Sequence, residues 1–348
     1  MTTALGPIRI DRVYTWSVRL GGCHPADEAL GLDGFLTTQA RRLLALAGVE
    51  HSFDRAHQML REFCGWTVDA EVIRKTTHAE ARRAQSERSE RVDATVFGST
   101  PGEVEVLIDA GKVNTREGWR DVKVGVFLKR RLGKSALPDE WASRVLPAPV
   151  IRTVVAAVEE VGRFGSRLRA ESDRLGITTQ PALTVLGDGA EWIWNVASEQ
   201  WPQASGVLDV FHAMEHVGDA VKTIWGTDNA ATDQRIASGR TALLGEGKPG
   251  LERWIGERYA ELPGRGDGEP LRALALYLAK HPTRLNYAER LASGRSIGSG
   301  AVEGAIKQLV NLRMKRTGAR WRAEHVGPLV ELRAMSYTSD WHSLWQAA

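Results

Sequence analysis

Three carboxylates stand in sequence contexts that suit the binding of hard metal ions. Asp109 ends the apolar run VEVLID, Asp188 follows the run ALTVLG, and Glu303 lies in the first turn of a late predicted helix. Catalytic groups of α/β sheets lie at the carboxyl ends of strands. Oxygen donors favour Mg²⁺ or Mn²⁺ over Zn²⁺, and two such ions can promote phosphoryl transfer. We therefore expect these three acids to be the catalytic residues and the ligands of two metal ions.

A fourth acid, Asp209, and its neighbour His212 follow a second short apolar run. The runs at 182–186 and 206–210 lie beside glycines, which predicts buried strands rather than helices. Asp209 would then end the strand next to the Asp188 strand, with His212 one turn further on. We expect this pair to be hydrogen-bonded and to support the backbone around the site rather than to bind the metal.

Basic residues flank these acids, although the formal net charge of the chain is only +3. Eight Lys or Arg and two acids lie between Lys112 and Lys134, and six basic residues and no acid lie from Ala305 to Arg322. These stretches favour a polyanion, with a solvated face as the alternative. The residues expected to bind DNA phosphates here are Lys123, Lys307, Arg313, Lys315, Arg316 and Arg320. Trp321 either stacks on a base or packs in the core.

The amino-terminal part of the chain is predicted to be irregular up to residue 25 and helical from Ala26 to about Arg91. Ser52 is a good N-cap for one helix, and Asp69 begins another. Two short helices around a glycine-containing turn fit a helix-turn-helix, whose second helix would direct Arg74, Lys75 and His78 towards DNA. An ordinary helical hairpin is the alternative. Residues 81–93 are charged all round and indicate a solvated linker helix.

The remaining elements follow from periodicity and turn signals. Residues 104–113 and 121–129 predict a β-hairpin with the long turn NTREGW, and 151–175 predict an amphipathic helix. From His212 to about Ala292 the pattern is helical, in pieces broken at Gly226, GEGKPG, PGRGDGEP and Pro282. Ser299 is a possible cap for the basic helix that carries Glu303.

Composition indicates an intracellular soluble protein. The chain has 348 residues, of which 43% are hydrophobic and 26% charged. Cys23 and Cys64 stand alone, so neither a disulfide framework nor a zinc knuckle is supported. The sequence contains no signal peptide and no apolar run of membrane-spanning length, so no membrane partner is expected.

Four blocks of the sequence together resemble a known family. They are LIDAGKVNTREGWRDVKVGVF, VLGDGAEWIWN, WPQASGVLDVFHAMEH and SIGSGAVEGAIKQLVNLRMKRTGARW. From about residue 26 onwards the chain is similar to bacterial insertion-sequence DDE transposases of the Mutator-related (ISKra-type) group, which have a ribonuclease H-like core. The resemblance implies that the catalytic acids are Asp109, Asp188 and Glu303. It also implies that the Asp-x-x-His signature of the family falls on Asp209 and His212.

The resemblance implies an α/β fold in which a ribonuclease H-like mixed sheet with flanking helices is interrupted by an all-helical insertion. The expected parts are an amino-terminal helical region (1–100), the first part of the core (101–211), the insertion (212–295) and the rest of the core with the Glu303 helix (296–348). The implied activity is Mg²⁺- or Mn²⁺-dependent cleavage at insertion-sequence ends and strand transfer into target DNA. The implied partners are the terminal inverted repeats and target DNA. A homodimer or higher oligomer on the DNA is expected, in the bacterial cytoplasm at the nucleoid.

The sequence departs from the family at two points. Related sequences carry cysteine pairs near the amino end, where this chain has only Cys23 and Cys64, so a metal-stabilised amino-terminal module is not supported. Gly304 also follows Glu303 where a serine is usual, which is a minor change.

Three other functions stay open from the sequence. HAMEH (212–216) fits the H-x-x-E-H pattern of one class of zinc metalloproteases, with His212 and His216 on one helix face and Glu289 as a third ligand. A non-catalytic DNA-binding protein derived from a transposase would not need intact acids. A junction resolvase of the same core fold would rarely need so large an insertion.

Overall fold

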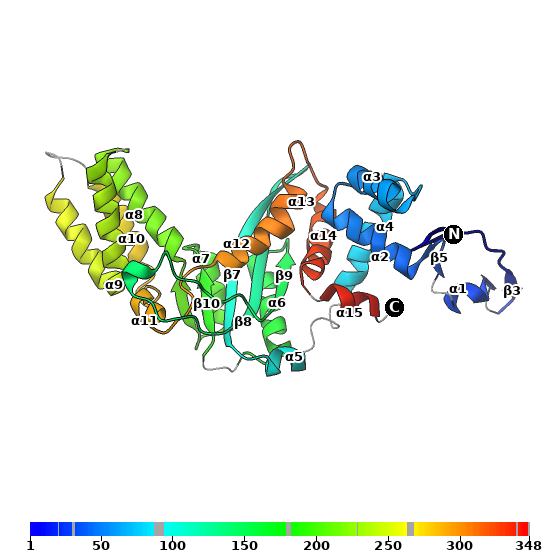
Figure 1. The fold of residues 1–348 in the computed structure, drawn as a ribbon, viewed down its shortest axis with the longest axis horizontal. Helices are drawn as coiled ribbons and strands as arrows, with labels where there is room; N and C mark the ends of the chain where they lie inside the picture. The colour runs from blue at the N-terminus through cyan, green and yellow to red at the C-terminus, as the bar shows by residue number, and fades with distance from the viewer. Residues whose placement is uncertain are drawn as a thin grey trace.

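The computed structural model describes residues 1–19, 21–29, 32–86, 94–178, 182–227, 229–262, 268–338 and 340–346. Figure 1 shows a sheet in the middle of the molecule, with one group of helices at each end of the long axis. The fold is therefore mixed α/β, as expected. None of the described helices combines the length and the apolar composition that crossing a membrane requires.

A five-stranded mixed sheet forms the centre, in the order β11-β10-β7-β8-β9. The strands β7 (Glu103–Thr115), β8 (Gly118–Arg130) and β9 (Ile151–Ala157) run antiparallel to one another. On the other side of β7, β10 (Thr184–Gly187) and β11 (Ser205–Leu208) run parallel to it. Every residue from Val104 to Ile108 is buried, so this apolar run forms the central strand of the core.

Two sequence predictions for this sheet are wrong. Residues 151–157 form β9, and the helix α6 (Val161–Arg174) begins only after it. Val154 and Val158 have helical spacing, but Thr153 to Ala157 are all buried, which is typical of a strand covered on both faces. The hairpin turn contains only Arg116 and Glu117, because β7 and β8 stay paired as far as Thr115 and Gly118.

The helices that follow the sheet strands are α7 (Glu191–Gln200) after β10 and α8 (Val210–Trp225) after β11. Late in the chain, α12 (Gly300–Ile306), a π-helical turn (Lys307–Asn311) and α13 (Leu312–Met314) pack along the hairpin. The predicted basic helix therefore ends at Met314, and Lys315 to Arg322 are not helical. Gly318, with φ of 76°, lies in this non-helical segment. The chain ends with α14 (Ala323–Ser336) and α15 (Asp340–Gln346).

The predicted insertion consists of helices with short non-helical breaks, such as residues 280–286 around Pro282. Its helices are α8, α9 (Ala230–Ala260), α10 (Glu269–Ala279) and α11 (Tyr287–Ala292), at one end of the molecule in Figure 1. The predicted breaks occur at Gly226, which ends α8, and at Gly247 in GEGKPG, where φ is 61° and α9 kinks. Residues 263–267 of the PGRGDGEP break lie outside the described residues.

The amino-terminal region begins with short strand pairs rather than helices. These strands are β1 (Thr2–Thr3), β2 (Gly6–Pro7), β3 (Thr15–Ser17), β4 (Gly21–Cys23), β5 (Leu32–Asp33) and β6 (Leu36–Thr37), with α1 (Pro25–Ala29) among them. The helices are α2 (Thr38–Glu50), α3 (Phe53–Cys64), α4 (Ala70–Ser86) and α5 (Ala94–Ser99). A 3-10 turn (Pro138–Glu140) follows the hairpin.

The α3-turn-α4 unit has the predicted helix caps, but its second helix does not direct all three predicted residues towards DNA. Ser52 Oγ accepts a hydrogen bond from the Arg55 N–H at 3.3 Å, and Asp69 Oδ1 accepts one from the Val72 N–H at 2.9 Å. His78, expected to face DNA, is only 7% exposed and lies between the rings of Phe53 and His325.

The predicted solvated linker helix is wrong over its first part. Ala81 and Ala84 are buried, because α4 packs against α2 and α14. Residues 87–93 of that prediction lie outside the described residues.

The 293–299 segment, which leads from the insertion into α12, is tied to the sheet at several points. Arg295 forms a bidentate ion pair with Glu103 on β7 at 2.8 Å, and the Ser296 hydroxyl donates to the buried Glu105. The Gly133 N–H donates to the Gly294 carbonyl at 2.9 Å, and the Val210 N–H donates to the Ile297 carbonyl at 3.1 Å. These bonds determine where α12 begins, and therefore where Glu303 lies.

We expect Gly294→Ala to destabilise the protein by about 2 kcal/mol or more. Gly294 has φ of 73°, which other residues rarely adopt, and an added Cβ would overlap the carbonyl oxygen of Gly133. Gly162→Ala in α6 is the control, because a Cβ there meets nothing within 4 Å. Chemical denaturation measures both variants, and equal stabilities would contradict this account of the 293–299 segment.

Candidate active site

Asp109 and Asp188 are neighbours across the sheet. The pairing of β7 with β10 ends at Ile108 and Gly187, and each aspartate is the next residue along the chain. A Cβ on Gly187 would lie 2.8 Å from the Ile193 side chain and 3.3 Å from the Ile108 carbonyl oxygen, so glycine permits this close packing. Asp188 follows the end of β10, as predicted. Asp109 lies within β7, contrary to prediction, because pairing with β8 continues to Thr115.

Glu303 approaches these two aspartates from α12. A Cβ on Gly111 would lie 2.8 Å from the Ile306 side chain, so glycine lets α12 lie directly on β7. Asp109 is half-buried, and its pKa rises to about 6 because of burial and, to a smaller extent, the carboxylates of Asp188 and Glu303. The fold therefore brings Asp109 and Asp188 side by side and places Glu303 near enough to influence the pKa of Asp109, but ligand atoms of the three acids do not all lie within 4.8 Å of one another.

Each of these three acids uses one carboxylate oxygen in a local hydrogen bond. Asp109 Oδ1 accepts from the Ala110 N–H at 2.6 Å, and Asp188 Oδ1 accepts from the Ala190 N–H at 2.8 Å. Glu303 Oε1 accepts from the Ser299 hydroxyl at 3.1 Å, so Ser299 caps the helix through Glu303 rather than through a backbone N–H. Among the described residues, no donor contacts the second oxygen of any of the three acids.

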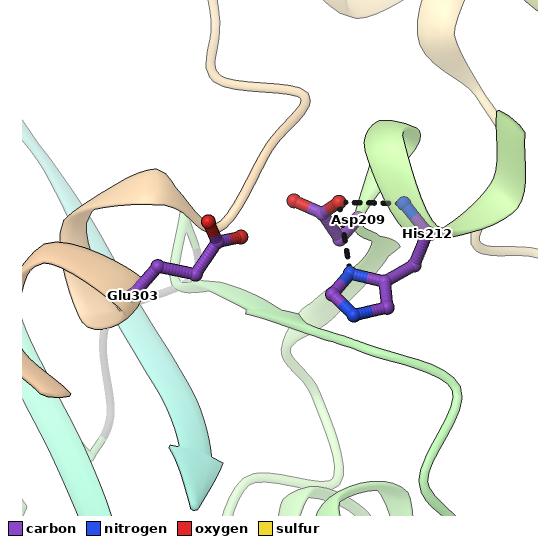
Figure 2. A group of neighbouring side chains, drawn as sticks. All are labelled: Asp209, His212 and Glu303. Atoms are coloured by element: carbon purple, nitrogen blue, oxygen red, sulfur yellow. Dashed lines mark hydrogen bonds and ion pairs between the residues drawn. The ribbon is translucent and has the colours of Figure 1, made fainter. Parts of the chain in front are cut away.

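Asp209, His212 and Glu303 form a second group (Figure 2). One potential ligand atom of each lies within 4.8 Å of the others, so this group could hold a metal ion. No other set of three or more His, Cys, Asp or Glu in the described part of the chain meets that limit. In Figure 2 the Glu303 carboxylate points towards Asp209.

Asp209 is fully buried, and both of its oxygens accept hydrogen bonds. Oδ1 accepts from the His212 N–H at 2.9 Å and lies 3.2 Å from His212 Nδ1, and Oδ2 accepts from the Ser299 N–H. The bond to Asp209 raises the pKa of His212 to about 9. Burial alone would raise the pKa of Asp209, but the bonds from His212 and Ser299 lower it.

These contacts separate two roles. Asp209 connects the start of α8 to Ser299, where α12 begins, and Ser299 in turn bonds to Glu303. Its oxygens are occupied, whereas Asp109, Asp188 and Glu303 each keep an oxygen that no described donor contacts. The hydrogen bonds therefore favour Asp209 and His212 as positioning residues. Glu303 belongs both to the set of three predicted catalytic acids and to the group that it forms with Asp209 and His212.

The insertion contributes Tyr277, a residue that the sequence analysis missed. Its ring stacks on His216, with centroids 3.8 Å apart, and its buried hydroxyl has no hydrogen-bond partner among the described residues. A Cβ on Gly189 would lie 2.5 Å from that hydroxyl, so the hydroxyl lies against the loop after Asp188. Burial and then the Asp188 carboxylate raise the pKa of Tyr277, which keeps it a donor. The only sequence signal is one polar atom in the apolar run ALALYLA (273–279).

The basic residues expected to bind DNA differ in how freely they can do so. Arg74 is paired with Glu71 at 2.7 Å, and Lys123 donates to the Glu159 carbonyl at 2.7 Å. Exposed side chains are those of Lys75, Lys307, Lys315, Arg316 and Arg320. The basic stretch 112–134 is not one surface patch, because Lys129 and Arg130 are buried and bonded to backbone carbonyls.

Arg313 is not on a DNA-facing surface, contrary to prediction. It is 3% exposed, and its guanidinium donates to the Gly48 carbonyl at 3.2 and 3.1 Å. The guanidinium carbon also lies 5.0 Å from the Phe53 ring centre and 4.8 Å from that of Trp321. Trp321 is half-buried, and its Nε1–H donates to the Met314 carbonyl at 3.2 Å, so packing occupies much of this ring.

The H-x-x-E-H zinc alternative has no support in the geometry. His212 Nδ1 bonds to Asp209, and His216 stacks on Tyr277. Within the described residues, the compact group of potential ligands includes His212 but neither His216 nor Glu289.

We expect Asp209→Asn to cost about 1–3 kcal/mol in stability. The asparagine side chain has one acceptor oxygen and one NH₂ group, which is a donor. The NH₂ group would therefore face another donor, the N–H of either His212 or Ser299. His212→Ala should cost less, because residue 212 keeps its N–H. Calorimetric titration with Mn²⁺ tests the roles: His212→Ala should retain affinity within roughly 10–100-fold. Complete loss of affinity in that variant would make His212 a ligand.

Tyr277→Phe should leave stability unchanged or raise it slightly, because it removes a buried hydroxyl without a partner. Tyr287→Phe is the matched control. The Tyr287 hydroxyl donates to the Leu208 carbonyl at 2.8 Å, so its loss should cost about 1–3 kcal/mol. Thermal unfolding of both variants is the measurement. A Tyr277→Phe variant as unstable as Tyr287→Phe would mean that the Tyr277 hydroxyl has a structural partner.

Comparison with known proteins assigns no family. No protein-family model matches the chain, and no curated protein matches it either. The functional conclusion therefore depends on the geometry of the acids and on the sequence resemblance.

Proposed function

We propose that this protein is a DDE transposase, which cleaves DNA at the ends of an insertion sequence and transfers the cut strand to target DNA. The observation that carries this proposal is the pair of adjacent aspartates, Asp109 on β7 and Asp188 after β10, with Glu303 on α12 close enough to raise the pKa of Asp109. The three residues lie far apart in the sequence, and a shared metal site would explain why the chain has a carboxylate at each of the three positions.

The sheet supports a ribonuclease H-like core. Three antiparallel strands are followed by two strands that run parallel to the first, and the two aspartates lie side by side on the central pair. The helices α8 to α11 separate β11 from the Glu303 helix, as the resemblance implies for the insertion.

The acids fit Mg²⁺ or Mn²⁺, which prefer oxygen donors. Asp109, Asp188 and Glu303 would hold two ions through the oxygens that contact no described donor. The raised pKa of Asp109 fits the same assignment, because burial beside other carboxylates favours a cation among them. When bound, such ions polarise the phosphate and activate the attacking hydroxyl.

Other residues of the chain orient the reacting groups. Asp209 bonds to the Ser299 N–H and the Ser299 hydroxyl bonds to Glu303, so these two residues fix the start of α12 and the position of the Glu303 carboxylate. The Tyr277 hydroxyl is a protonated donor beside the Asp188 loop, where it can bond to a phosphate oxygen of the DNA. Lys307 is exposed four residues after Glu303, on the same helix face, and can contact a neighbouring phosphate.

We expect Asp109→Asn, Asp188→Asn and Glu303→Gln each to lower DNA cleavage by at least about a thousandfold, because groups that act as a unit fail together. The assay uses a supercoiled plasmid that carries the DNA flanking the coding sequence, with Mg²⁺. DNA binding should persist in all three variants and with Ca²⁺ in place of Mg²⁺.

Glu289→Gln is the matched control. It neutralises an exposed carboxylate on α11 that the zinc alternative would need, and it should cleave like the wild type. Full cleavage by any of the three acid variants would refute the proposal. Specific DNA binding by a wild-type protein that never cleaves would instead identify a non-catalytic transposase derivative.

A further inference from the structure

A cavity of about 600 Å³ lies at the tip of the β7–β8 hairpin, away from the acids. It is enclosed by the α3–α4 unit on one side and by residues 319–325 on the other. The 319–325 segment is attached to the hairpin: Trp321 N–H donates to the Asn114 carbonyl at 3.1 Å, and the Arg116 N–H donates to the Trp321 carbonyl at 2.8 Å. Figure 1 shows the hairpin tip reaching past α13 towards α3.

The walls of this cavity are strongly basic. Five arginines line it, together with two histidines and a single acid, Asp54; the arginines are Arg74, Arg116, Arg313, Arg320 and Arg322. Arg74 and Arg322 are paired with Glu71 and Glu324. Arg116 and Arg320 are exposed, and among the described residues neither side chain has a carboxylate partner. An excess of cations facing one hollow concentrates positive potential there, so the cavity is suited to an anion.

A buried group at the wall also lacks a partner. His78 is 7% exposed, and no described residue hydrogen-bonds to its Nε2 atom. Burial, then His325 and the surrounding arginines, lower the pKa of His78 to about 4, so the ring is neutral near pH 7. A buried polar atom without a partner is costly, and a ligand oxygen in the cavity would satisfy its N–H.

The hairpin relates this cavity to the acids. Arg116 follows Asp109 by seven positions along the β7–β8 hairpin, which corresponds to roughly 24 Å at ~3.4 Å per residue. One turn of duplex DNA spans about 34 Å, and over that length phosphates of both strands come round to the face that contacts the protein. A duplex with a phosphate at the acids can therefore also present a phosphate to the cavity, within about one helical turn.

We propose that this cavity binds the backbone of the same DNA duplex that the acids cleave, within about one helical turn of the reacting phosphate. This inference deepens the proposed function and rests on it. Arg116 and Arg320 contact the phosphates, while Arg313 and Trp321 form the packed wall behind them.

The test uses a fluorescent 20-base-pair duplex of arbitrary sequence, which is long enough to span both sites, with Ca²⁺ present to prevent cleavage. Fluorescence anisotropy measures affinity over a range of salt concentrations. The variant Arg116→Gln/Arg320→Gln should bind roughly tenfold or more weakly at about 100 mM salt, and the slope of log K against log salt should fall by about two. Arg61→Gln, an exposed arginine on α3 outside the cavity, should leave both unchanged.

Two results would overturn the inference. One is a salt slope that is identical in the wild type and the double variant. The other is a result in which inorganic phosphate stabilises the wild type but not the double variant, while both proteins bind DNA with equal affinity. That result would mean that the cavity binds a free anion.

Failure of the proposed function gives a different pattern. If cleavage needs the three acids but the slopes coincide, only the cavity inference fails. If the slopes differ but the acid variants cleave like the wild type, the proposed function fails, and the cavity binds DNA for another purpose.

Discussion

The buried carboxylate of Asp209 is the interaction on which the candidate site depends. One of its oxygens accepts from the first turn of α8, and the other accepts from Ser299, ninety positions later. Between these two points the chain leaves the sheet, forms four helices and returns. The bidentate ion pair between Arg295 and Glu103 on β7 reinforces this connection. Because Ser299 also donates to Glu303, a single buried acid links the start of the insertion to the last catalytic candidate.

The acids themselves are arranged at an electrostatic cost. Burial, and to a smaller extent the carboxylates of Asp188 and Glu303, raise the pKa of Asp109. A bound cation would favour the charged form of this carboxylate. Asp209 has the opposite environment, because hydrogen bonds from His212 and Ser299 compensate for its burial. Aspartates on adjacent strands therefore differ in the hydrogen-bond donors that surround them, although their residue type is the same.

The long β7–β8 hairpin gives the molecule its second organising feature. Its central part carries Asp109, and its tip carries the wall of the basic cavity. Thirteen consecutive residue pairs hold the two regions at a set separation. The tip also binds residues 319–322 and lies against the α3–α4 unit, so amino-terminal and carboxyl-terminal parts of the chain meet there. Arg313, buried at this junction, bonds to Gly48 and contributes to the packing as much as to the charge.

The sequence alone determined the local features. Short apolar runs beside glycines predicted β10 and β11, Ser52 and Asp69 predicted two helix starts, and three isolated acids were selected by the residues around them and by a resemblance. Each of these signals lies within a few residues, where capping and burial patterns operate. Residues 151–157 were misassigned because β-branched residues at helical spacing also fit a buried strand. Only the tertiary structure decided that Arg313 and His78 are buried, that Tyr277 reaches the Asp188 loop and that Asp209 bonds to Ser299. Those outcomes depend on contacts between segments tens to hundreds of residues apart, and no local pattern records which segments the packed core brings together.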